Sequence, residues 1–456
     1  MGSKRSSLRA VTGTVPPVGW AFFPLDEVLG LRAKVAFTPR LEESMVRLST
    51  WMPFRPASRE LAFFTGVQVA EATLRQVTEQ AGAAQVRIQQ EQTTTLLHER
   101  PQSPTGPKVE LMSLDGCYIQ LVGGEWKEVK TVALGVVNEP VEERGEQVVH
   151  TRELTYFSRM SESGQFQQAA LVEIHERGVE KAETVCAVSD GADWIPKFVD
   201  YHRPNAVRIL DFAHAMEYVA QAGQAAHEQL PCPEALATTE ERTTFKQARF
   251  QQWLKHQRHE LKTGEASKVL AELSRLQTLM QERHVESAVE TITKKLAYVR
   301  ERQAMLTYAT FQAQGYPIGS GSVESANKLV VQSRLKGAGM RWEPEHVNAM
   351  LALRNLACND RWDQGWQAIR HRWQQEAQAQ RRQRAARSSL QPADEPSSPA
   401  VPPVQTQASD QLETPPAGMV TVPQQIVPVA ERTGSQPTRP AATHPWRRPF
   451  LRRRLA

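Results

Sequence analysis

The stretch TVCAVSDGADW, residues 184–194, decides the fold class of this chain. It is a short apolar run that ends in Asp190-Gly191, which is typical of a strand buried within a sheet that is covered on both faces. Runs rich in β-branched and aromatic residues come before it, with short turns between them, and they predict successive strands. These runs are KVELMSLDGCYIQLV (108–122), EWKEVKTVALGVV (125–137) and RELTYFSRM (152–160).

The residues after Asp190 continue the sheet. A predicted helix, 192–202, leads to another apolar run, NAVRILDFAHA at 205–215. Antiparallel strands followed by strands that alternate with helices predict a mixed α/β sheet. From about 215 to 313 the pattern is almost purely helical, so we expect an all-helical insertion that interrupts the sheet domain. Its apolar stripes favour core or helix-pairing faces; they are Leu270, Leu273, Leu276, Met280, Val285, Val289, Ile292, Leu296 and Val299.

The segments on either side complete the predicted organisation. Residues 58–82 have the outline of a helix-turn-helix with its turn at Gly66, although two packed helices of any small domain would look similar. Residues 388–443 are rich in Pro, Ser, Thr and Gln, which predicts disorder. Basic residues flank this tail, which either grips phosphates or is a solubilising extension. The expected parts are 1–100 (N-terminal helical, DNA-binding), 108–214 (catalytic core, first part), 215–313 (helical insertion), 314–375 (core, second part) and 376–456 (tail).

Composition excludes several classes of protein. Hydrophobic residues make up 40% and charged residues 23% of the 456 residues, as in an ordinary soluble protein. No apolar run approaches the ~20 residues of a membrane span, and MGSKRSSLRA lacks a secretory apolar region, so we expect a cytoplasmic protein. The four cysteines lie singly, which argues against a zinc ribbon or a disulfide framework.

Three carboxylates are the candidate metal ligands. Asp115 and Asp190 lie near the ends of predicted strands, and Glu324 follows GSGS in the first turn of a predicted helix. Carboxylates at such positions can share Mg²⁺, which prefers oxygen ligands. The alternatives are that each Asp-Gly pair marks a turn and that the helix dipole favours an acid at Glu324.

Polar and basic residues surround these carboxylates in the sequence. Asp211 and His214, spaced as Asp-x-x-His, are candidate auxiliary residues, or else an ordinary buried hydrogen-bonded pair. Backbone N–H groups in the GSGS segment favour a phosphate site at a helix start, and the basic segment after it predicts contacts to the same DNA strand, unless it is a solvated helix face. The candidate DNA-binding residues are Ser320, Ser322, Lys328, Arg334, Lys336, Arg341 and Trp342.

Three blocks, taken in order, resemble a known family. SLDGCYIQ…EWKEVKT, VSDGADW…ILDFAHAMEY and GSGSVESANKLVVQSRLKGAGMRW are similar to those of DDE transposases of bacterial insertion sequences, in the ISKra-type group related to the Mutator-like transposases. The resemblance covers roughly residues 15–365. It implies a ribonuclease H-like core interrupted by a helical insertion, with Asp115, Asp190 and Glu324 as the catalytic triad. Asp211 and His214 match the (C/D)xxH motif of the Mutator-like relatives.

The chain departs from that family in two ways. Many relatives have an N-terminal cysteine-rich zinc segment, whereas the first cysteine here is Cys117. The proline-rich basic tail also lies outside the family pattern.

The resemblance also implies a reaction and partners. Asp115, Asp190 and Glu324 would hold two Mg²⁺ ions, or Mn²⁺ in their place, which would supply activation of a water and of a DNA 3′-OH for in-line attack on phosphorus. The partners are the element's terminal inverted repeats, the target DNA and further copies of the chain in a dimer or larger oligomer, without a membrane and at the nucleoid. Alternatives are a ribonuclease H-like nuclease that only cuts, a transposase-derived DNA-binding protein without activity, and a helical scaffold.

Overall fold

A computed structural model describes residues 13–15, 20–22, 37–143, 146–235 and 238–389. The chain divides into two compact units, Met1–Gln391 and Pro392–Ala456, and every described residue belongs to the first. The short strands β1 (Gly13–Val15) and β2 (Trp20–Phe22) pair with each other in an antiparallel manner. In the part of the chain that is described, no helix is both long enough and apolar enough to span a membrane.

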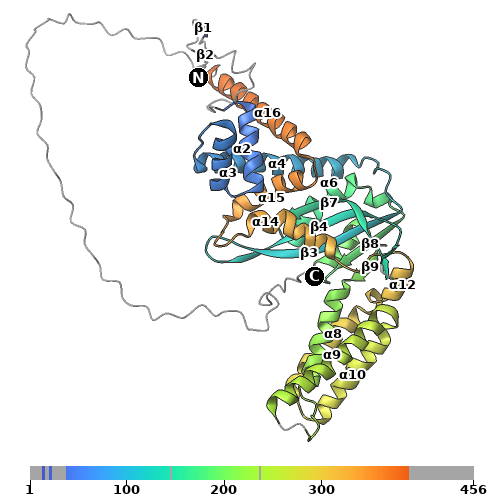
Figure 1. The fold of residues 1–456 in the computed structure, drawn as a ribbon. Helices are drawn as coiled ribbons and strands as arrows, with labels where there is room; N and C mark the ends of the chain where they lie inside the picture. Colours follow the sequence, from blue (N-terminus) through green and yellow to red (C-terminus); the bar gives the residue numbers. More distant parts are fainter. Residues whose placement is uncertain (1–12, 16–19, 23–36, 144–145, 236–237, 390–456) are drawn as a thin grey trace, which may run out of the picture. The chain divides into compact units, whose positions relative to one another are not determined.

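A five-stranded mixed sheet forms the centre of the first unit (Figure 1). Its strand order is β7-β4-β3-β8-β9, so β3, the first of the five in the sequence, is the central strand. The β3 pairing with β4 and the β4 pairing with β7 are antiparallel, whereas β8 is parallel to β3 and to β9. The predicted mixed α/β sheet is therefore confirmed. The strands are β3 (Val109–Gln120), β4 (Trp126–Val137), β7 (Thr151–Arg159), β8 (Thr184–Ser189) and β9 (Val207–Leu210); β5 (Val141–Glu143) and β6 (Glu146–Val148) form a separate hairpin.

Alternate side chains of each strand point to opposite faces of the sheet. Both faces carry apolar side chains, and helices cover them. Met112 and Leu114 of β3 lie in a buried cluster with Phe166 and Phe198, from α5 (Ser163–Ala169) and α7 (Ile195–His202); α6 (Leu171–Glu176) and η1 (Val179–Lys181) also contribute. Cys117 and Ile119 lie in a different cluster. That cluster is completed by α13 (Gly321–Ala326), the π-helix η3 (Asn327–Gln332), α14 (Ser333–Leu335) and α15 (Pro344–Cys358).

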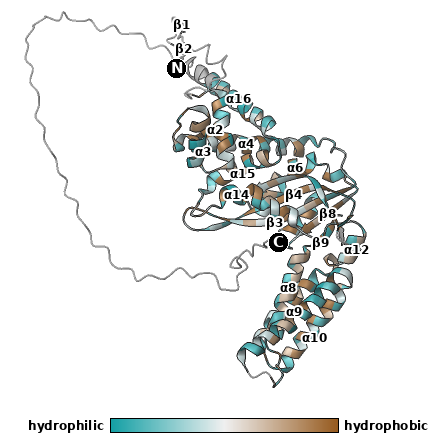
Figure 2. Cartoon of the chain, in the orientation of Figure 1, coloured by the Kyte–Doolittle hydropathy of each residue, from teal (hydrophilic) through white to brown (hydrophobic). Residues whose placement is uncertain are grey.

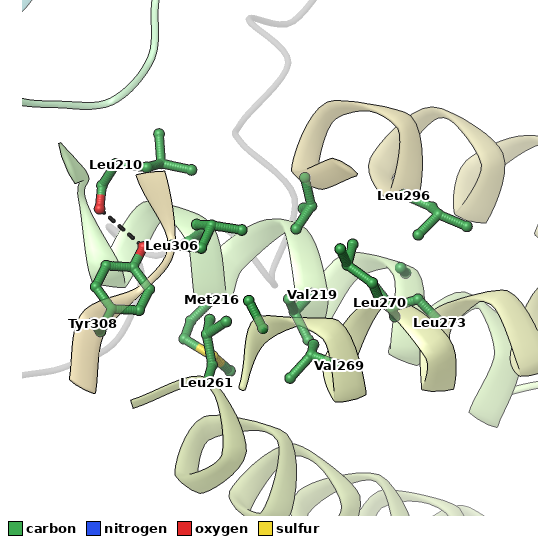
Figure 3. Close-up of a cluster of buried hydrophobic side chains, with 14 of the residues drawn as sticks. Leu210, Met216, Val219, Leu261, Val269, Leu270, Leu273, Leu296, Leu306 and Tyr308 are labelled. Atoms are coloured by element: carbon green, nitrogen blue, oxygen red, sulfur yellow. Dashed lines mark hydrogen bonds between the residues drawn. The ribbon is translucent and has the colours of Figure 1, made fainter. Parts of the chain in front are cut away.

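The described residues of the insertion predicted at 215–313 form helices joined by turns and loops, and they include no strand. The predicted stripes are confirmed for Leu270, Leu273 and Leu276, which are buried in one cluster, and Figure 2 shows apolar and polar residues side by side on these helices. Tyr308 Oη donates to Leu210 O (2.9 Å) at the base of the cluster (Figure 3). The elements are α8 (Phe212–His227), α9 (Thr239–Thr263), α10 (Ala266–Glu282), α11 (Glu286–Glu301), η2 (Gln303–Met305) and α12 (Tyr308–Ala313).

The N-terminal helices differ from the predicted helix-turn-helix. The first, α3 (Phe54–Thr65), ends at Gly66 as expected, with φ of 70°. The second, α4 (Glu71–Glu99), does not end near residue 81 but continues for a further 18 residues. A Cβ placed on Gly82 would lie 2.2 Å from the carbonyl oxygen of Ala349, so α4 crosses α15 in close contact. The middle of α4 is therefore a core helix, and its last turns, from residue 90 on, are largely exposed. With α2 (Pro39–Trp51) and α16 (Trp362–Ser389) it forms one buried cluster.

The predicted tail begins too early. Residues 376–389 are helical and belong to α16. This helix begins with the buried tryptophans Trp362, Trp366 and Trp373 and continues to Ser389. The rest of the predicted tail lies outside the described residues.

Candidate active site

The parallel pairing of β3 with β8 places two of the three predicted carboxylates beside each other. Leu114 pairs with Ser189, and the next residues on the two strands are Asp115 and Asp190. Asp190 follows the last residue of β8, so its backbone has left the sheet. Its Oδ1 accepts from Ala192 N at 3.0 Å, which turns the chain directly after the strand.

Asp115 is held by hydrogen bonds to both carboxylate oxygens. Gly116 N donates to Oδ1 (2.7 Å) and the Asn327 side-chain amide donates to Oδ2 (2.8 Å). Burial, together with the negative charges of Asp190 and Glu324, raises the pKa of Asp115 to about 6. The three predicted carboxylates thus act on one another electrostatically, although they lie far apart in the sequence.

Glu324 reaches this region from α13. It lies in the first turn of that helix, is exposed, and its Oε1 lies 3.4 Å from Ser320 Oγ. Beyond it the chain forms the π-helix η3, whose first residue is Asn327. The buried Arg354 donates to Val330 O (3.1 Å) and to Leu329 O, and these contacts stabilise the carbonyls of this irregular turn.

Asn327 was not predicted from the sequence. It is three residues after Glu324, so it shares a face of the helical segment with it, and it is 2% exposed. Its Oδ1 has no hydrogen-bond partner among the described residues. The spacing alone would have suggested Asn327 as a neighbour of Glu324, but not its bond to Asp115.

The donor set suits a hard divalent cation. Within the described residues, no three His, Cys, Asp or Glu side chains are gathered closely enough to hold a metal ion as they stand. The three residues nevertheless offer carboxylate oxygens, which are the ligands that Mg²⁺ and Mn²⁺ prefer. Burial and the repulsion from the other two carboxylates raise the pKa of Asp115, and a bound cation would relieve that repulsion.

Asp211 connects the insertion to the segment that carries Glu324. It caps α8, and its Oδ1 accepts from His214 N at 2.7 Å. Its Oδ2 accepts from Ser320 N at 2.6 Å. The His214 ring packs against the Tyr218 ring in an edge-to-face arrangement, with ring centres 5.2 Å apart. The Asp-x-x-His pair therefore includes a buried carboxylate that orders the backbone.

Some of the predicted DNA-binding residues are engaged inside the protein. Arg334 is 1% exposed, donates to Ser49 O at 2.8 Å, and its guanidinium lies over the rings of Phe54 and Trp342. Trp342 is 6% exposed and donates to Leu335 O. The N–H of Ser320 is already taken by Asp211. Arg334, Trp342 and the Ser320 amide, all predicted to contact DNA, are thus engaged in contacts within the fold.

The other members of the predicted set remain accessible. Lys328, Lys336 and Arg341 are exposed and Ser322 is partly buried. Lys336 Nζ lies 5.8 Å from the ring centre of Trp126, a side chain that is half exposed. The structure thus leaves a smaller basic surface than the sequence predicted.

Comparison with known proteins gives one short similarity. No protein-family model matches the chain. A segment of 64 residues is 36% identical to a curated protein of Streptococcus gallolyticus described as "UPF0236 protein in vanSb 3'region". The similar segment covers 14% of this chain and 14% of that protein, so the likeness is to one part of each.

Proposed function

We propose that this protein is a DDE-type DNA transposase of an insertion sequence. Its catalytic core is ribonuclease H-like, and Asp115, Asp190 and Glu324 hold two Mg²⁺ ions, for which Mn²⁺ can substitute. Its substrates are the inverted repeats at the ends of the element and the target DNA. Because two ends are joined in one reaction, the active form is a dimer or a larger oligomer.

The observation that supports this proposal is the placement of Asp115 beside Asp190, with Glu324 near enough to act on Asp115 electrostatically. Leu114 and Ser189 are a parallel pair, so Asp115, within the central strand β3, lies beside Asp190, which directly follows β8. The charge of Glu324, more than 200 residues from Asp115 in the sequence, acts on the same carboxyl group. A buried group with a strongly raised pKa beside like charges is a common feature of functional sites. The strand order and the helical insertion between Asp190 and Glu324 support the ribonuclease H-like assignment.

The side chains have distinct tasks in this proposal. Each carboxylate has about four lone-pair sites, and Asp115 uses one on each oxygen for Gly116 and Asn327, which fixes its plane and leaves the others free. Asp190 would offer the oxygen that does not bind Ala192 N, and Glu324 would complete the set from α13. Divalent cations bound there would stabilise the charge on the attacking and leaving oxygens of a phosphodiester.

Asp211 serves this arrangement indirectly. By accepting from the N–H groups of both His214 and Ser320, it fixes the segment that leads into Glu324. Lys328 and Lys336 are exposed on the segment after Glu324, where they can neutralise phosphates of the bound strand. We assign Arg341 and Ser322 to the same surface.

The test is cleavage of a labelled duplex that carries the element's own ends, with Mg²⁺ and with EDTA. Glu324→Gln removes one charge and keeps the shape, so it should bind the duplex but not cut it. Glu286→Gln is the matched control, because Glu286 is also an exposed acid in the first turn of a helix, α11. Wild type and control should cut at the element boundary only with Mg²⁺. Equal cutting by all three proteins would contradict the triad, and cutting without transfer to a target would indicate a nuclease.

A further inference from the structure

Side chains from the end of the helical insertion hold the backbone at Asp190. Tyr298, in α11, donates from its hydroxyl to the carbonyl oxygen of Asp190 at 2.6 Å. Arg302, which caps the same helix, donates from Nη2 to the carbonyl oxygen of Gly191 at 3.3 Å. Two consecutive peptide groups that follow β8 are thus bound by residues more than 100 positions later in the sequence.

The contact is close. Gly191 has φ of +80°, a conformation that favours glycine. A Cβ placed on it would lie 2.5 Å from the Tyr298 hydroxyl and 3.1 Å from Arg302 Nε. The glycine therefore lets both side chains approach the main chain directly.

Tyr298 is itself fixed in place. Its ring stacks on Tyr218 of α8, with centres 3.9 Å apart and planes 10° apart. The Arg302 guanidinium lies 3.8 Å from the centre of the Tyr298 ring on which it packs, and Lys295 Nζ lies 4.6 Å from the Tyr218 ring centre. The ring of His214 contacts Tyr218 as well. Residues of two helices of the insertion, α8 and α11, therefore orient the Tyr298 hydroxyl together.

The pairing of the sheet ends before Asp190. The last parallel pair between β8 and β9 is Ser189 with Leu210, and Asp211 N then donates to Ser189 O (2.7 Å). The carbonyl groups of Asp190 and Gly191 lie beyond these bonds. Their direction, and with it the direction of the Asp190 side chain, depends on the residues that donate to them from outside the sheet.

We propose that Tyr298 and Arg302 are positioning residues through which the helical insertion orients Asp190 toward Asp115. The proposal rests on the proposed function in one respect, namely that Asp190 is a metal ligand. Residues that orient a ligand without touching the metal change metal affinity or activity by about 10- to 100-fold when they are replaced. Here the oriented group is the peptide that carries the ligand.

The test compares two tyrosines that make the same kind of bond. Tyr298→Phe removes the hydroxyl that binds Asp190 O and keeps the ring. Tyr308→Phe is the matched control, because the Tyr308 hydroxyl also donates to a main-chain carbonyl, that of Leu210, in the same cluster. Calorimetric titration of the full-length, DNA-free protein with Mn²⁺ gives the Kd. Hydrogen exchange of the segment 186–194 in EDTA reports on the backbone without metal.

We expect Tyr298→Phe to weaken Mn²⁺ binding about 10-fold and to speed exchange at Gly191 and Ala192, while Tyr308→Phe changes neither. Arg302→Lys, which keeps the charge but loses the planar fork, should act in the same direction as Tyr298→Phe. Wild-type affinity and exchange in Tyr298→Phe, or equal losses in both tyrosine variants, would overturn the inference. If the wild type binds no Mn²⁺, the proposed metal site is wrong. Hydrogen exchange then tests the orienting role of Tyr298 by itself. Faster exchange in Tyr298→Phe would support that role, and unchanged exchange would overturn it.

Discussion

The side-chain amide of Asn327 donates to Asp115 Oδ2 across 212 residues of sequence, at 2.8 Å. This bond joins the central strand of the sheet to the helical segment that carries Glu324. It supports the charged form of a carboxyl group whose pKa is raised to about 6, chiefly by burial. Asn327 therefore couples the two segments that bring Asp115 and Glu324 to the site.

Replacing Asn327 should cost stability only while Asp115 is present. A hydrogen bond to a charged group contributes about 1.5–3 kcal/mol, so we expect Asn327→Ala to lower the free energy of unfolding by that amount at pH 7.5. Urea unfolding of both single variants and of Asn327→Ala with Asp115→Asn gives the coupling between the two sites. If the two changes are additive, the bond does not contribute to stability.

The stability of the metal-free protein should depend on pH through Asp115. Its folded-state pKa of about 6 lies above the ordinary value of 3.8, so folding favours the protonated form. The contribution of Asp115 to the free energy of unfolding is complete below pH ~4, and it is lost as the pH rises through about 6. Asp115→Asn carries no charge at any pH and should be the more stable protein above pH 6, by at most about 3 kcal/mol. Unfolding in EDTA from pH 4 to 8 measures this, and an equal difference at every pH would contradict the assignment.

DNA binding should depend on the exposed lysines and not on Arg334. Neutralising Lys328 or Lys336 should reduce the slope of log K against log salt by about 0.9 for each phosphate that the variant no longer neutralises. Arg334→Met should leave the slope unchanged, since that guanidinium is 1% exposed and binds Ser49 O. Fluorescence anisotropy with a labelled duplex at several salt concentrations gives the slopes. A lower slope for Arg334→Met alone would show that Arg334 contacts phosphate, as its place in the sequence suggested.

The crossing of α4 and α15 should not tolerate a side chain at Gly82. The added methyl of Gly82→Ala would meet the main chain of Ala349, and overpacking of this kind costs about 1–3 kcal/mol. Gly164→Ala is the control, because a Cβ on this residue of α5 would meet no described atom within 4 Å. We expect the control to be neutral or stabilising by about 0.5 kcal/mol. Equal midpoints for the two variants in urea unfolding would argue against the close crossing.

The sequence predicted the features that depend on local pattern. Alternation and β-branched residues located the strands, and apolar residues at helical spacing located the buried stripes of the insertion at Leu270, Leu273 and Leu276. Asp115 and Asp190 were identified as Asp-Gly pairs near the ends of predicted strands. Asp190 does follow the last residue of β8, whereas Asp115 lies within β3, which continues to Gln120.

Contacts between segments that are distant in the sequence could not be predicted from local sequence patterns. An arginine near a candidate active site suggests phosphate, and nothing local to Arg334 shows that Phe54, Trp342 and Ser49 O surround it. The length of α4 was underestimated because Gly82 resembles a helix end, whereas it marks the approach of α15. Tyr298 and Arg302 lie on an ordinary amphipathic helix, and only the fold brings them to Asp190 and Gly191.

The central claim is that Asp115, Asp190 and Glu324 together bind the catalytic cations. The most direct measurement is anomalous scattering from crystals of the protein grown with Mn²⁺ and a duplex of the element's end. We predict Mn²⁺ peaks within about 2.0–2.4 Å of oxygens from all three carboxylates, with the scissile phosphate beside them. Mn²⁺ bound elsewhere on the chain, or a phosphate held at this site without any cation, would contradict the account.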